Sequence, residues 1–518
     1  MKKTGVSVVF LFILTLLIIN GLIITTAYKA IFNYFKHVNA PPYLELTTDA
    51  ITVLLACLVV FTAIVIILER RDPARTLAWL LVLIFLPVLG FVLYMTVGRQ
   101  IRKRRLTAKK RRLSEFIYPL EESIPESNPD FSKLPASKER LMNLIINTAE
   151  SPITLYNDVQ VLTDGDQIFS AMFEALESAR EHIHLETYIL RSDEIGSRLM
   201  EILLAKARQG VEVRVIYDAL GSRELGESYL QSLRQAGIKI EPFFPVRFPI
   251  LHNRINYRNH RKILVVDGRI GFVGGANIGD EYLGRDPGIG YWRDTHLRIS
   301  GNAVCFLQRI FLLDWYFITK ESLEEKFPCP TGERPGNKIV QIASSGPDTH
   351  WESIMQAYYY AIATAEKSVH LSSAYFIPNE SILTALKTAA LSGVDVKILL
   401  PDRTDHQIVF LAAMSYLEEL MEAGVEVYLY QKGLMHCKVL TVDGVLSVIG
   451  SANMDQRSFR LNFEVNALVY DKETARRLDE DFARDLLDSH ALDLESFKER
   501  SLPRRVLESA ARLLSPLL

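Results

Sequence analysis

One short pattern of chemically active residues occurs twice in the 518-residue chain. Each copy contains a histidine, a lysine two positions later, an aspartate five positions after that and an asparagine ten positions further on. The two sets are His260, Lys262, Asp267 and Asn277, and His436, Lys438, Asp443 and Asn453. A lone His-x-Lys is a weak signal, but two copies with the same spacing indicate one function that needs both.

These residue types suit chemistry at a phosphodiester. Two lysine ammonium groups and two asparagine amides can hold the negative phosphate oxygens without a metal ion or another cofactor. One imidazole can attack phosphorus to form a phosphohistidine, while the other protonates the leaving alcohol and then deprotonates the incoming one. Imidazole titrates near pH 6.5, so a neutral and a protonated ring can coexist at neutral pH. In-line displacement needs these two groups on opposite faces of the phosphorus, which explains the duplication.

The local geometry of each copy fits this interpretation. Residues two apart on a strand point to the same face, so each histidine is expected beside its lysine. The dipeptides Asp267-Gly268 and Asp443-Gly444 are typical of tight β-hairpin turns. We therefore expect these two aspartates to support the turns of the catalytic pattern rather than to touch the substrate.

The elements around the pattern also occur twice, in the order strand, helix, strand, helix, strand. Apolar runs predict strands at 181–190, 210–217 and 236–240 in the first half and at 368–375, 393–400 and 423–427 in the second. Such alternation predicts βαβ units in a mainly parallel sheet with helices on both faces. The sequence therefore predicts an α/β fold of two duplicated halves related by a pseudo-twofold.

Three apolar segments, at 5–25, 51–68 and 77–97, precede the duplicated halves. Each is about as long as a transmembrane helix, and the first is too long for the apolar core of a signal peptide and lacks a clear cleavage site. We expect a membrane anchor over 1–28, a transmembrane hairpin region over 45–98, a basic linker over 99–150, catalytic halves over 151–335 and 336–490, and an amphipathic tail over 491–518.

A dense basic cluster follows the third apolar segment. Nine lysines and arginines and no acid lie between Arg99 and Arg112. Such a cluster favours anionic lipid headgroups and a cytoplasmic location. Three crossings from a cytoplasmic N-terminus would place it outside, so either the N-terminus is outside or the segment broken by Pro87 and Gly90 is re-entrant. We expect a multi-pass membrane protein with a cytoplasmic catalytic part.

Composition narrows the possible partners. The net charge of −2 gives no sign of a nucleic-acid partner. The four cysteines, Cys57, Cys305, Cys329 and Cys437, lack metal-ligand spacing, and we expect scattered thiols in a reducing compartment. Apolar residues at helical spacing in 504–518 predict an amphipathic helix that packs either on the catalytic core or on a bilayer surface. The oligomeric state stays open, and a homo-oligomer is possible.

The repeated stretches resemble the paired H-x-K-x4-D motifs of the phospholipase D superfamily over roughly residues 150 to 490. More narrowly, the chain is similar to bacterial cardiolipin synthases. That similarity rests on Arg70-Arg71-Asp72-Pro73, Leu77-Ala78-Trp79-Leu80, the stretches from Gly450 to Phe459 and from Asn462 to Glu464, and the Ser515-Pro516-Leu517-Leu518 ending. It implies transphosphatidylation in a bacterial plasma membrane, in which one phosphatidylglycerol gives up glycerol and a second captures the phosphatidyl group as cardiolipin.

The resemblance also implies roles for individual residues. His260 would be the nucleophile and His436 the acid and base, although the residues themselves leave the reverse assignment open. Asp294 and Glu464, each just before an expected strand, would orient the histidines through the ring nitrogen that does not react. The groups that bind the phosphate oxygens would be Lys262, Lys438, Asn277 and Asn453.

The two copies differ at one position near the site. The first copy has Gly275 where the second has Ser451, so any hydroxyl contact to the phosphate is expected on one side only.

Other functions of the same superfamily remain as alternatives. A membrane-bound hydrolase or another phosphatidyltransferase would use the same residues, and a nuclease could use the basic cluster at 99–112 on DNA. The apolar segments favour a lipid substrate over nucleic acid, because they bring the site to a bilayer. In a scaffold protein without activity, at least one copy of the pattern would be expected to have lost its residues, whereas both copies are intact.

Overall fold

The computed structural model describes residues 43–69, 73–98 and 135–515, apart from 246–255 and positions 286, 287, 289, 324, 325, 328, 329, 331 and 405. The chain forms two units, Met1–Arg102 with Phe248–Asn253, and Lys103–Arg247 with Arg254–Leu518. The expected segment at 5–25, the basic cluster at 99–112 and Cys329 lie outside the described residues.

The N-terminal unit consists of apolar helices: α2 (Tyr43–Leu68), α3 (Pro73–Phe85), α4 (Pro87–Leu93) and a π-helical turn at Tyr94–Gly98. The predicted break at Pro87 is confirmed, because α3 ends just before the proline and α4 begins with it, as proline favours a first helical turn. Counting only residues that the structure describes, no helix has both the length and the hydropathy of a membrane span. The expected membrane crossings are therefore not confirmed.

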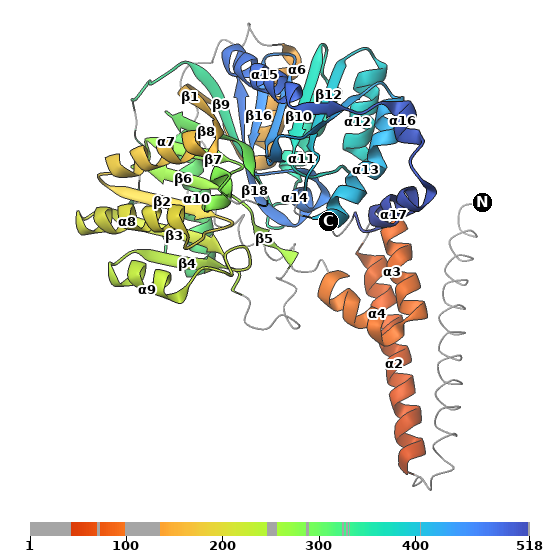
Figure 1. The fold of residues 1–518 in the computed structure, drawn as a ribbon. Coiled ribbons are helices and arrows are strands. Elements are labelled where there is room, and N and C mark those ends of the chain that lie inside the picture. Colours follow the sequence, from red (N-terminus) through yellow and green to blue (C-terminus); the bar gives the residue numbers. More distant parts are fainter. Residues whose placement is uncertain are drawn as a thin grey trace. The chain divides into compact units, whose positions relative to one another are not determined.

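The larger unit contains both repeated halves (Figure 1). The elements of the first half are β1 (Thr154–Asp164), α7 (Gly165–Ser178), β2 (His182–Thr187), α8 (Glu194–Arg208), β3 (Glu212–Asp218), α9 (Glu227–Gln235), β4 (Lys239–Phe243), β5 (Arg258–Asn259), β6 (Ile263–Val266), β7 (Ile270–Gly274), the 3-10 turn η4 (Asp280–Leu283), β8 (Tyr291–Ser300) and α10 (Ala303–Thr319). The three strands expected here are confirmed as β2, β3 and β4.

The second half repeats this order. Its elements are β9 (Lys338–Ser345), α11 (Ser353–Ala363), β10 (Ser368–Ser373), β11 (Phe376–Ile377), α12 (Glu380–Leu391), β12 (Asp395–Pro401), α13 (Gln407–Glu422), β13 (Glu426–Tyr430), β14 (Gly433–Met435), β15 (Lys438–Val442), β16 (Leu446–Gly450), β17 (Met454–Asp455), α14 (Gln456–Arg460), β18 (Asn462–Tyr470) and α15 (Lys472–Leu487), and β19 (Ser489–Ala491), α16 (Leu494–Lys498) and α17 (Leu502–Leu513) follow. Helix α6 (Ala136–Ala149) precedes β1 in the chain but contacts α11 and β9 of this half. The strands expected here are confirmed as β10, β12 and β13.

Each half combines parallel and antiparallel strands. Strands β2, β3 and β4, and likewise β10, β12 and β13, pair in parallel. Strands β6, β7 and β8, and likewise β15, β16 and β18, continue each sheet in antiparallel pairs. The expectation of a mainly parallel sheet is therefore wrong. The Asp-Gly turns explain why the sheet is mixed, because two-residue hairpin connections join only antiparallel strands.

Two short parallel pairings cross from one half to the other. Strand β5 pairs with the start of β18, and β14 pairs with the start of β8. Immediately after these pairings, the backbone N–H of His260 donates to the Phe463 carbonyl at 2.9 Å, and that of His436 donates to the Arg293 carbonyl at 2.7 Å. Each catalytic-pattern histidine is therefore positioned by a strand of the opposite half.

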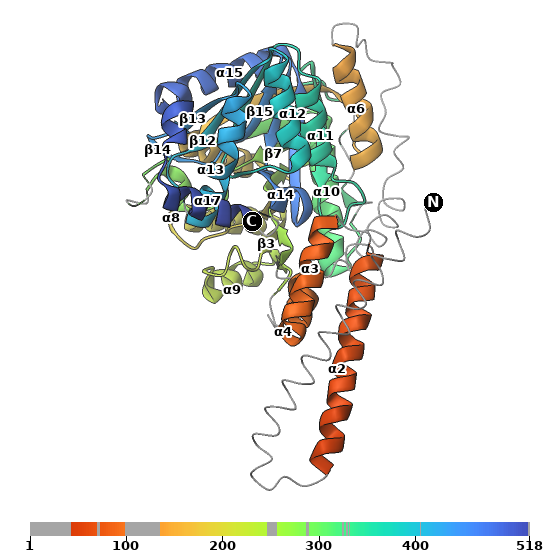
Figure 2. The same ribbon diagram turned by 90° about the vertical axis from the view of Figure 1, so that its right-hand side faces the viewer.

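The halves also share a hydrophobic core. Helices α7, α8 and α9 pack on the first half and α11, α12 and α13 on the second, as Figures 1 and 2 show. Between the halves, buried aliphatic side chains from both form one continuous cluster. It includes Val265, Val273, Leu297, Ile449, Val465 and Ala467. Burial of this kind contributes roughly 1.5–3 kcal/mol per large aliphatic side chain, so it fixes the halves against each other.

The cysteines differ from one expectation. Cys57 and Cys437 are free thiols, as expected, and Cys437 is buried. Cys305, however, is disulfide-bonded. The expectation of four scattered thiols is therefore wrong at this position.

Candidate active site

His260 lines a large cavity, and a carboxylate of the other half holds its ring. Nδ1 of His260 lies 3.0 Å from each carboxylate oxygen of Glu464 on β18. The ring of Tyr188 meets it edge-on, with 5.1 Å between ring centroids. Because Nδ1 is occupied by Glu464, Nε2 is the nitrogen available to a bound molecule.

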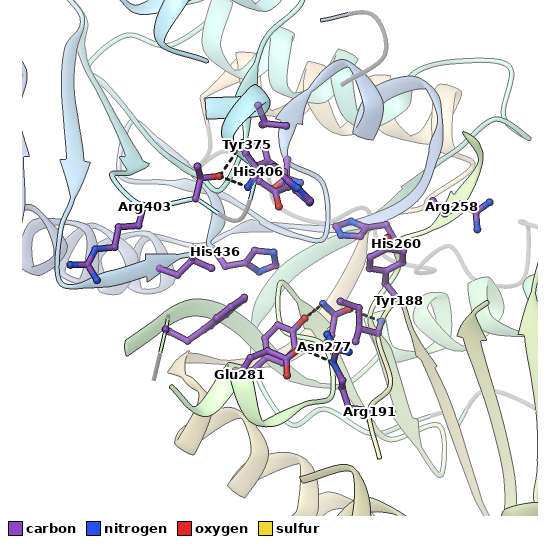
Figure 3. A pocket seen from close by; sticks show the side chains of 18 of the residues that line it. Tyr188, Arg191, Arg258, His260, Asn277, Glu281, Tyr375, Arg403, His406 and His436 are labelled. Atoms are coloured by element: carbon purple, nitrogen blue, oxygen red, sulfur yellow. Dashed lines mark hydrogen bonds and ion pairs between the residues drawn. The ribbon is translucent and has the colours of Figure 1, made fainter. Parts of the chain in front are cut away.

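His436 has the same arrangement in reverse. Its Nδ1 lies 2.8 Å from Oδ2 of Asp294 on β8, and the ring packs near Trp292 at 5.2 Å between centroids. Asp294 and Glu464 lie within β8 and β18 rather than before them, because both strands begin earlier than expected. Each half thus supplies one histidine and the carboxylate that orients the histidine of the other half. Figure 3 shows the two rings facing one another across the pocket.

The two lysines lie behind the histidines and are almost fully buried. Nζ of Lys262 donates to the carbonyl of His260 at 2.8 Å, and Nζ of Lys438 donates to that of His436 at 2.5 Å. Neither lysine lines the cavity itself. Burial lowers the pKa of Lys262 well below its ordinary value, Glu464 opposes the shift, and the positive charge of Lys438 adds to it. The site therefore concentrates positive charge that a phosphodiester would offset.

The electrostatics favour neutral imidazole rings in the free site. Burial lowers the pKa of His260 to about 4, with Glu464 opposing and Lys262 adding to the shift. Burial and Lys438 likewise lower the pKa of His436, against the opposing effect of Asp294. A neutral ring whose Nδ1–H donates to a carboxylate presents the Nε2 lone pair to the cavity, as a nucleophile requires.

The two orienting carboxylates are ionised. Burial alone would raise their pKa values, but His260 and Lys262 hold the pKa of Glu464 below its ordinary value. His436 and Lys438 do the same for Asp294. A charged acceptor fixes the proton of each imidazole on Nδ1, because that tautomer alone donates toward the carboxylate.

The two asparagines at the cavity differ in the hydrogen bonds of their side chains. Nδ2 of Asn277 donates to the Tyr282 hydroxyl at 2.6 Å, and its Oδ1 accepts from the backbone N–H of Ile189 at 3.2 Å. Oδ1 of Asn453 is buried and has no hydrogen-bond partner among the described residues. Both side chains line the same cavity. The carbonyl oxygen of Asn453 is therefore an acceptor that a donor group of a bound molecule could reach.

The Gly275 and Ser451 difference has a local cause. The Ser451 hydroxyl donates to Glu464 and does not line the cavity, which differs from the expected contact with a phosphate. At Gly275, an added Cβ would lie 2.0 Å from Oδ1 of Asp294. The first copy needs glycine there because Asp294 occupies the space that a side chain would fill.

Asp267 and Asp443 lie in the hairpin turns, where they hold the backbone. Asp267 and Gly268 have φ values of 53° and 65°, and Asp443 and Gly444 have 58° and 63°, as in a type I′ turn. The Asp267 carboxylate accepts three backbone N–H groups of residues 180–182, and Asp443 accepts three of residues 366–368. Neither lines the cavity.

The Asp443 carboxylate also neutralises a buried lysine, which makes its loss costly. Lys138 Nζ lies 3.0 Å from Asp443 Oδ2, and the Lys138 side chain is 1% exposed. We expect Asp443→Ala to destabilise the protein by about 3–5 kcal/mol, because it leaves that charge unpaired. Asp443→Asn keeps a side-chain oxygen that accepts the backbone N–H groups, so its effect on stability reports the loss of the ion pair with Lys138 alone. Thermal unfolding of the solubilised protein measures both, and an unaltered melting point with lost activity would contradict a supporting role.

The cavity is formed by both halves and has a volume of about 1350 Å³. It is large enough for more than one lipid headgroup, since small-molecule sites measure roughly 300–1,000 Å³. Several lining residues lay outside the predicted set because no repeated pattern marks them. They include Tyr188, Arg258, Tyr282, Trp292, Arg403, Asp455 and Arg457. Burial raises the pKa of Asp455 to about 6, so the cavity also contains a carboxyl group that titrates near neutrality.

The buried histidines predict a loss of stability in mild acid. Burial lowers the pKa of His260 and of His296 on β8 to about 4, against 6.5 in the unfolded chain. Below pH 6.5 the unfolded chain therefore binds protons that the folded chain does not. We expect the free energy of unfolding to fall by about 3 kcal/mol per histidine between pH 6.5 and pH 4.

Denaturant titrations across this pH range measure the effect. A His296→Gln variant removes one of the two contributions and should flatten the profile. A stability that stays constant from pH 7 to pH 4.5 would rule out the proposed burial of neutral rings.

Comparisons with known proteins agree with this site. A family described as "Cardiolipin synthase, PLD-like domain" matches residues 172–288 and 358–486, and one described as "Phospholipase_D-nuclease N-terminal" matches 57–99. The cardiolipin synthase of Geobacillus sp. (strain WCH70) is 50% identical over 470 residues, covering 90% of this chain and 94% of the relative. That of Listeria innocua serovar 6a (strain ATCC BAA-680 / CLIP 11262) is 42% identical over 476 residues, covering 90% and 98%.

A solved structure shares the fold at low sequence identity. The phosphatidylserine synthase of Haemophilus influenzae Rd KW20 superposes with a TM-score of 0.56 at 15% identity, covering 74% of this chain and 100% of that one. Both duplicated halves are matched by the family, and the curated relatives extend over nine-tenths of the chain. The chain therefore belongs to the cardiolipin synthase family of proteins with phospholipase D-like domains.

Proposed function

We propose that the protein is a phosphatidyltransferase that converts two phosphatidylglycerol molecules into cardiolipin and glycerol. The observation that carries this proposal is the pair of histidines at one cavity, each oriented through Nδ1 by a carboxylate of the opposite half. The curated relatives named cardiolipin synthase support the choice of reaction.

In the first step, Nε2 of His260 attacks the phosphorus of one phosphatidylglycerol. A P–N bond forms, and the P–O bond to the headgroup glycerol breaks. His436 gives its proton to the departing glycerol oxygen. Lys262 and Lys438 hold the non-bridging oxygens, whose negative charge offsets the lysine charges that lower the pKa of His436. Substrate binding therefore favours the protonated His436 that this step needs.

In the second step, the terminal hydroxyl of another phosphatidylglycerol attacks the same phosphorus. His436 takes the hydroxyl proton, the new P–O bond forms and the P–N bond to His260 breaks. His260 is then neutral and His436 protonated, as they were when the first substrate was bound, so a turnover consumes no proton. Asn453 lines the cavity, and its Nδ2, the donor atom of the amide, would bind a phosphate oxygen. Asp294 and Glu464 keep the rings in the required tautomer.

We further propose that the N-terminal unit lies in the bacterial plasma membrane as a multi-pass region. Its helices expose large apolar side chains, including Leu54, Phe61, Leu68 and Phe85. Exposed apolar patches of this kind mark surfaces that meet a membrane or a partner. The basic cluster at 99–112 supports a cytoplasmic location for the larger unit, which contains both halves and is called the catalytic unit below. The disulfide of Cys305 instead fits an oxidising compartment. Protease digestion of intact spheroplasts decides between them, because only an external catalytic unit is cut.

Incubation of the purified full chain with phosphatidylglycerol in mixed micelles tests the reaction. Cardiolipin and glycerol in equal amounts, formed in the presence of a chelator, are the expected products. Phosphatidic acid as the main product would show that water captures the intermediate and would make the protein a hydrolase. A product formed only with an added alcohol, such as serine, would indicate a different phosphatidyltransferase.

A further inference from the structure

The C-terminal helix α17 has one face on the catalytic unit and another that faces away from it. Glu508, Ala511 and Ser515 are buried against the unit. The Ser515 hydroxyl is 2.9 Å from the Tyr416 hydroxyl of α13. Arg512 donates to a carboxylate oxygen of Glu419, also on α13, at 2.9 Å. The helix is therefore held in place by polar contacts on one side.

Its outward face is apolar. Five large aliphatic side chains on and just after α17 are between 43% and 81% exposed, and they are Leu502, Val506, Leu507, Leu513 and Leu514. At about 100° per residue, they occupy a continuous arc of roughly 140° next to the buried face. Because these side chains are exposed, this apolar stripe lacks a partner within the described chain. A helix that faced water would carry polar residues there.

The charges on α17 are unevenly distributed. Its residues include three arginines and one acid, and that acid, Glu508, is the buried one. Glu508 pairs with Arg500 and Arg504. Apart from Ser509, the exposed side chains of the helix are therefore apolar or cationic, and none of them is acidic. This combination is typical of helices that lie in the headgroup region of an anionic bilayer.

The helix also lies close to the mouth of the catalytic cavity. Ile408, at the start of α13, lines the cavity and is 52% exposed. Arg512 of α17 contacts the carbonyl of Ser415 on the same helix. Seven residues separate Ile408 from Ser415, which is about 10 Å along an α-helix. A surface that seats α17 would therefore also meet the cavity mouth.

We propose that the apolar stripe of α17 docks the catalytic unit onto an anionic bilayer and holds the cavity mouth at the lipid headgroups. This inference rests on the proposed function, because a phosphatidylglycerol substrate resides in that bilayer. The surface acts apart from the N-terminal unit: it sets the orientation of the cavity rather than tethering the chain. Lipid headgroups then reach His260 and His436 without leaving the membrane completely.

Paired activity measurements test the docking surface. The full chain with Val506→Asp and Leu513→Asp is compared with Leu391→Asp, a similarly exposed leucine at the end of a different helix, α12. We expect the α17 variant to lose at least tenfold in cardiolipin formation on phosphatidylglycerol vesicles and less than twofold in mixed micelles. The Leu391 variant should stay within twofold in both. Equal activity of the α17 variant on vesicles would overturn the proposal.

A spectroscopic readout separates this surface from the reaction. In a Cys57→Ser background, which removes an exposed thiol, Leu507→Cys is labelled with an environment-sensitive fluorophore. A blue shift on addition of phosphatidylglycerol vesicles, absent with neutral phosphatidylcholine vesicles, is expected. A probe that is already shielded without lipid, in proportion to protein concentration, would assign the stripe to a second copy of the chain. If the wild-type protein forms no cardiolipin in micelles, the proposed function is wrong. The fluorescence of the labelled variant still tests whether the α17 surface binds the bilayer.

Discussion

His260→Ala and His436→Ala are each expected to lower cardiolipin formation by at least about 10³-fold, because each removes a group that makes or breaks a bond at phosphorus. Neither change should unfold the protein, since both rings line a cavity and each leaves a carboxylate next to a buried lysine. Cardiolipin formation in mixed micelles, with melting temperature as control, measures the effect. Activity above about 5% of wild type in either variant would contradict the shared two-histidine site.

The same variants can assign the two roles. In a phosphodiester with a p-nitrophenyl group, the p-nitrophenolate leaves without taking up a proton, so its release does not need the general acid. With this substrate, His436→Ala should release one equivalent of p-nitrophenol and retain the phosphoryl group on the protein. His260→Ala should release none. The opposite result would make His436 the nucleophile and His260 the acid.

Glu464→Gln and Asp294→Asn are expected to lower turnover by about 10²- to 10⁴-fold while leaving the cavity intact. An amide in place of the carboxylate can donate to Nδ1, which favours the tautomer with its proton on the reactive nitrogen. Asp294→Asn should also move the alkaline limb of the pH profile to lower pH, because the protonated His436 loses its counter-charge.

A matched pair of variants distinguishes positioning from structure. Asp294→Asn should still give the p-nitrophenol burst, because that step does not use His436 as an acid, whereas Glu464→Gln should slow the burst itself. Ser451→Ala removes a single donor to Glu464 and should lower turnover by less than about tenfold. Equal losses in all assays with an unchanged pH profile would mean that the carboxylates only support the fold.

Much of the catalytic unit could be predicted from local patterns. The spacing of His260 and His436 with their lysines, and the Asp-Gly turns, are contained within short stretches, and hydrophobic periodicity located the six parallel strands. These features depend on neighbours close in sequence, which is why the residues alone reveal them. The roles of Asp294 and Glu464, by contrast, came from the resemblance to the phospholipase D superfamily.

The cross-half pairings could not be predicted in this way. Strand β5 is two residues long and β14 three, too short for a periodic signal, and their partners lie roughly 140 to 200 positions away. The need for Gly275 likewise depends on Asp294, which approaches it only in the folded chain. The mixed sheet followed from the hairpins, whose antiparallel geometry outweighed the βαβ expectation.

The exchange of carboxylates between the halves makes complete folding a condition for reactivity. A chain that has folded only its first half carries His260 but lacks Glu464, so its imidazole has no fixed tautomer and no partner acid. The second half alone has the same defect, with His436 lacking Asp294. Under the proposed mechanism, a nascent or damaged molecule would therefore not form a phosphatidyl adduct that water could hydrolyse. Reactivity would require both halves to be closed on their shared core.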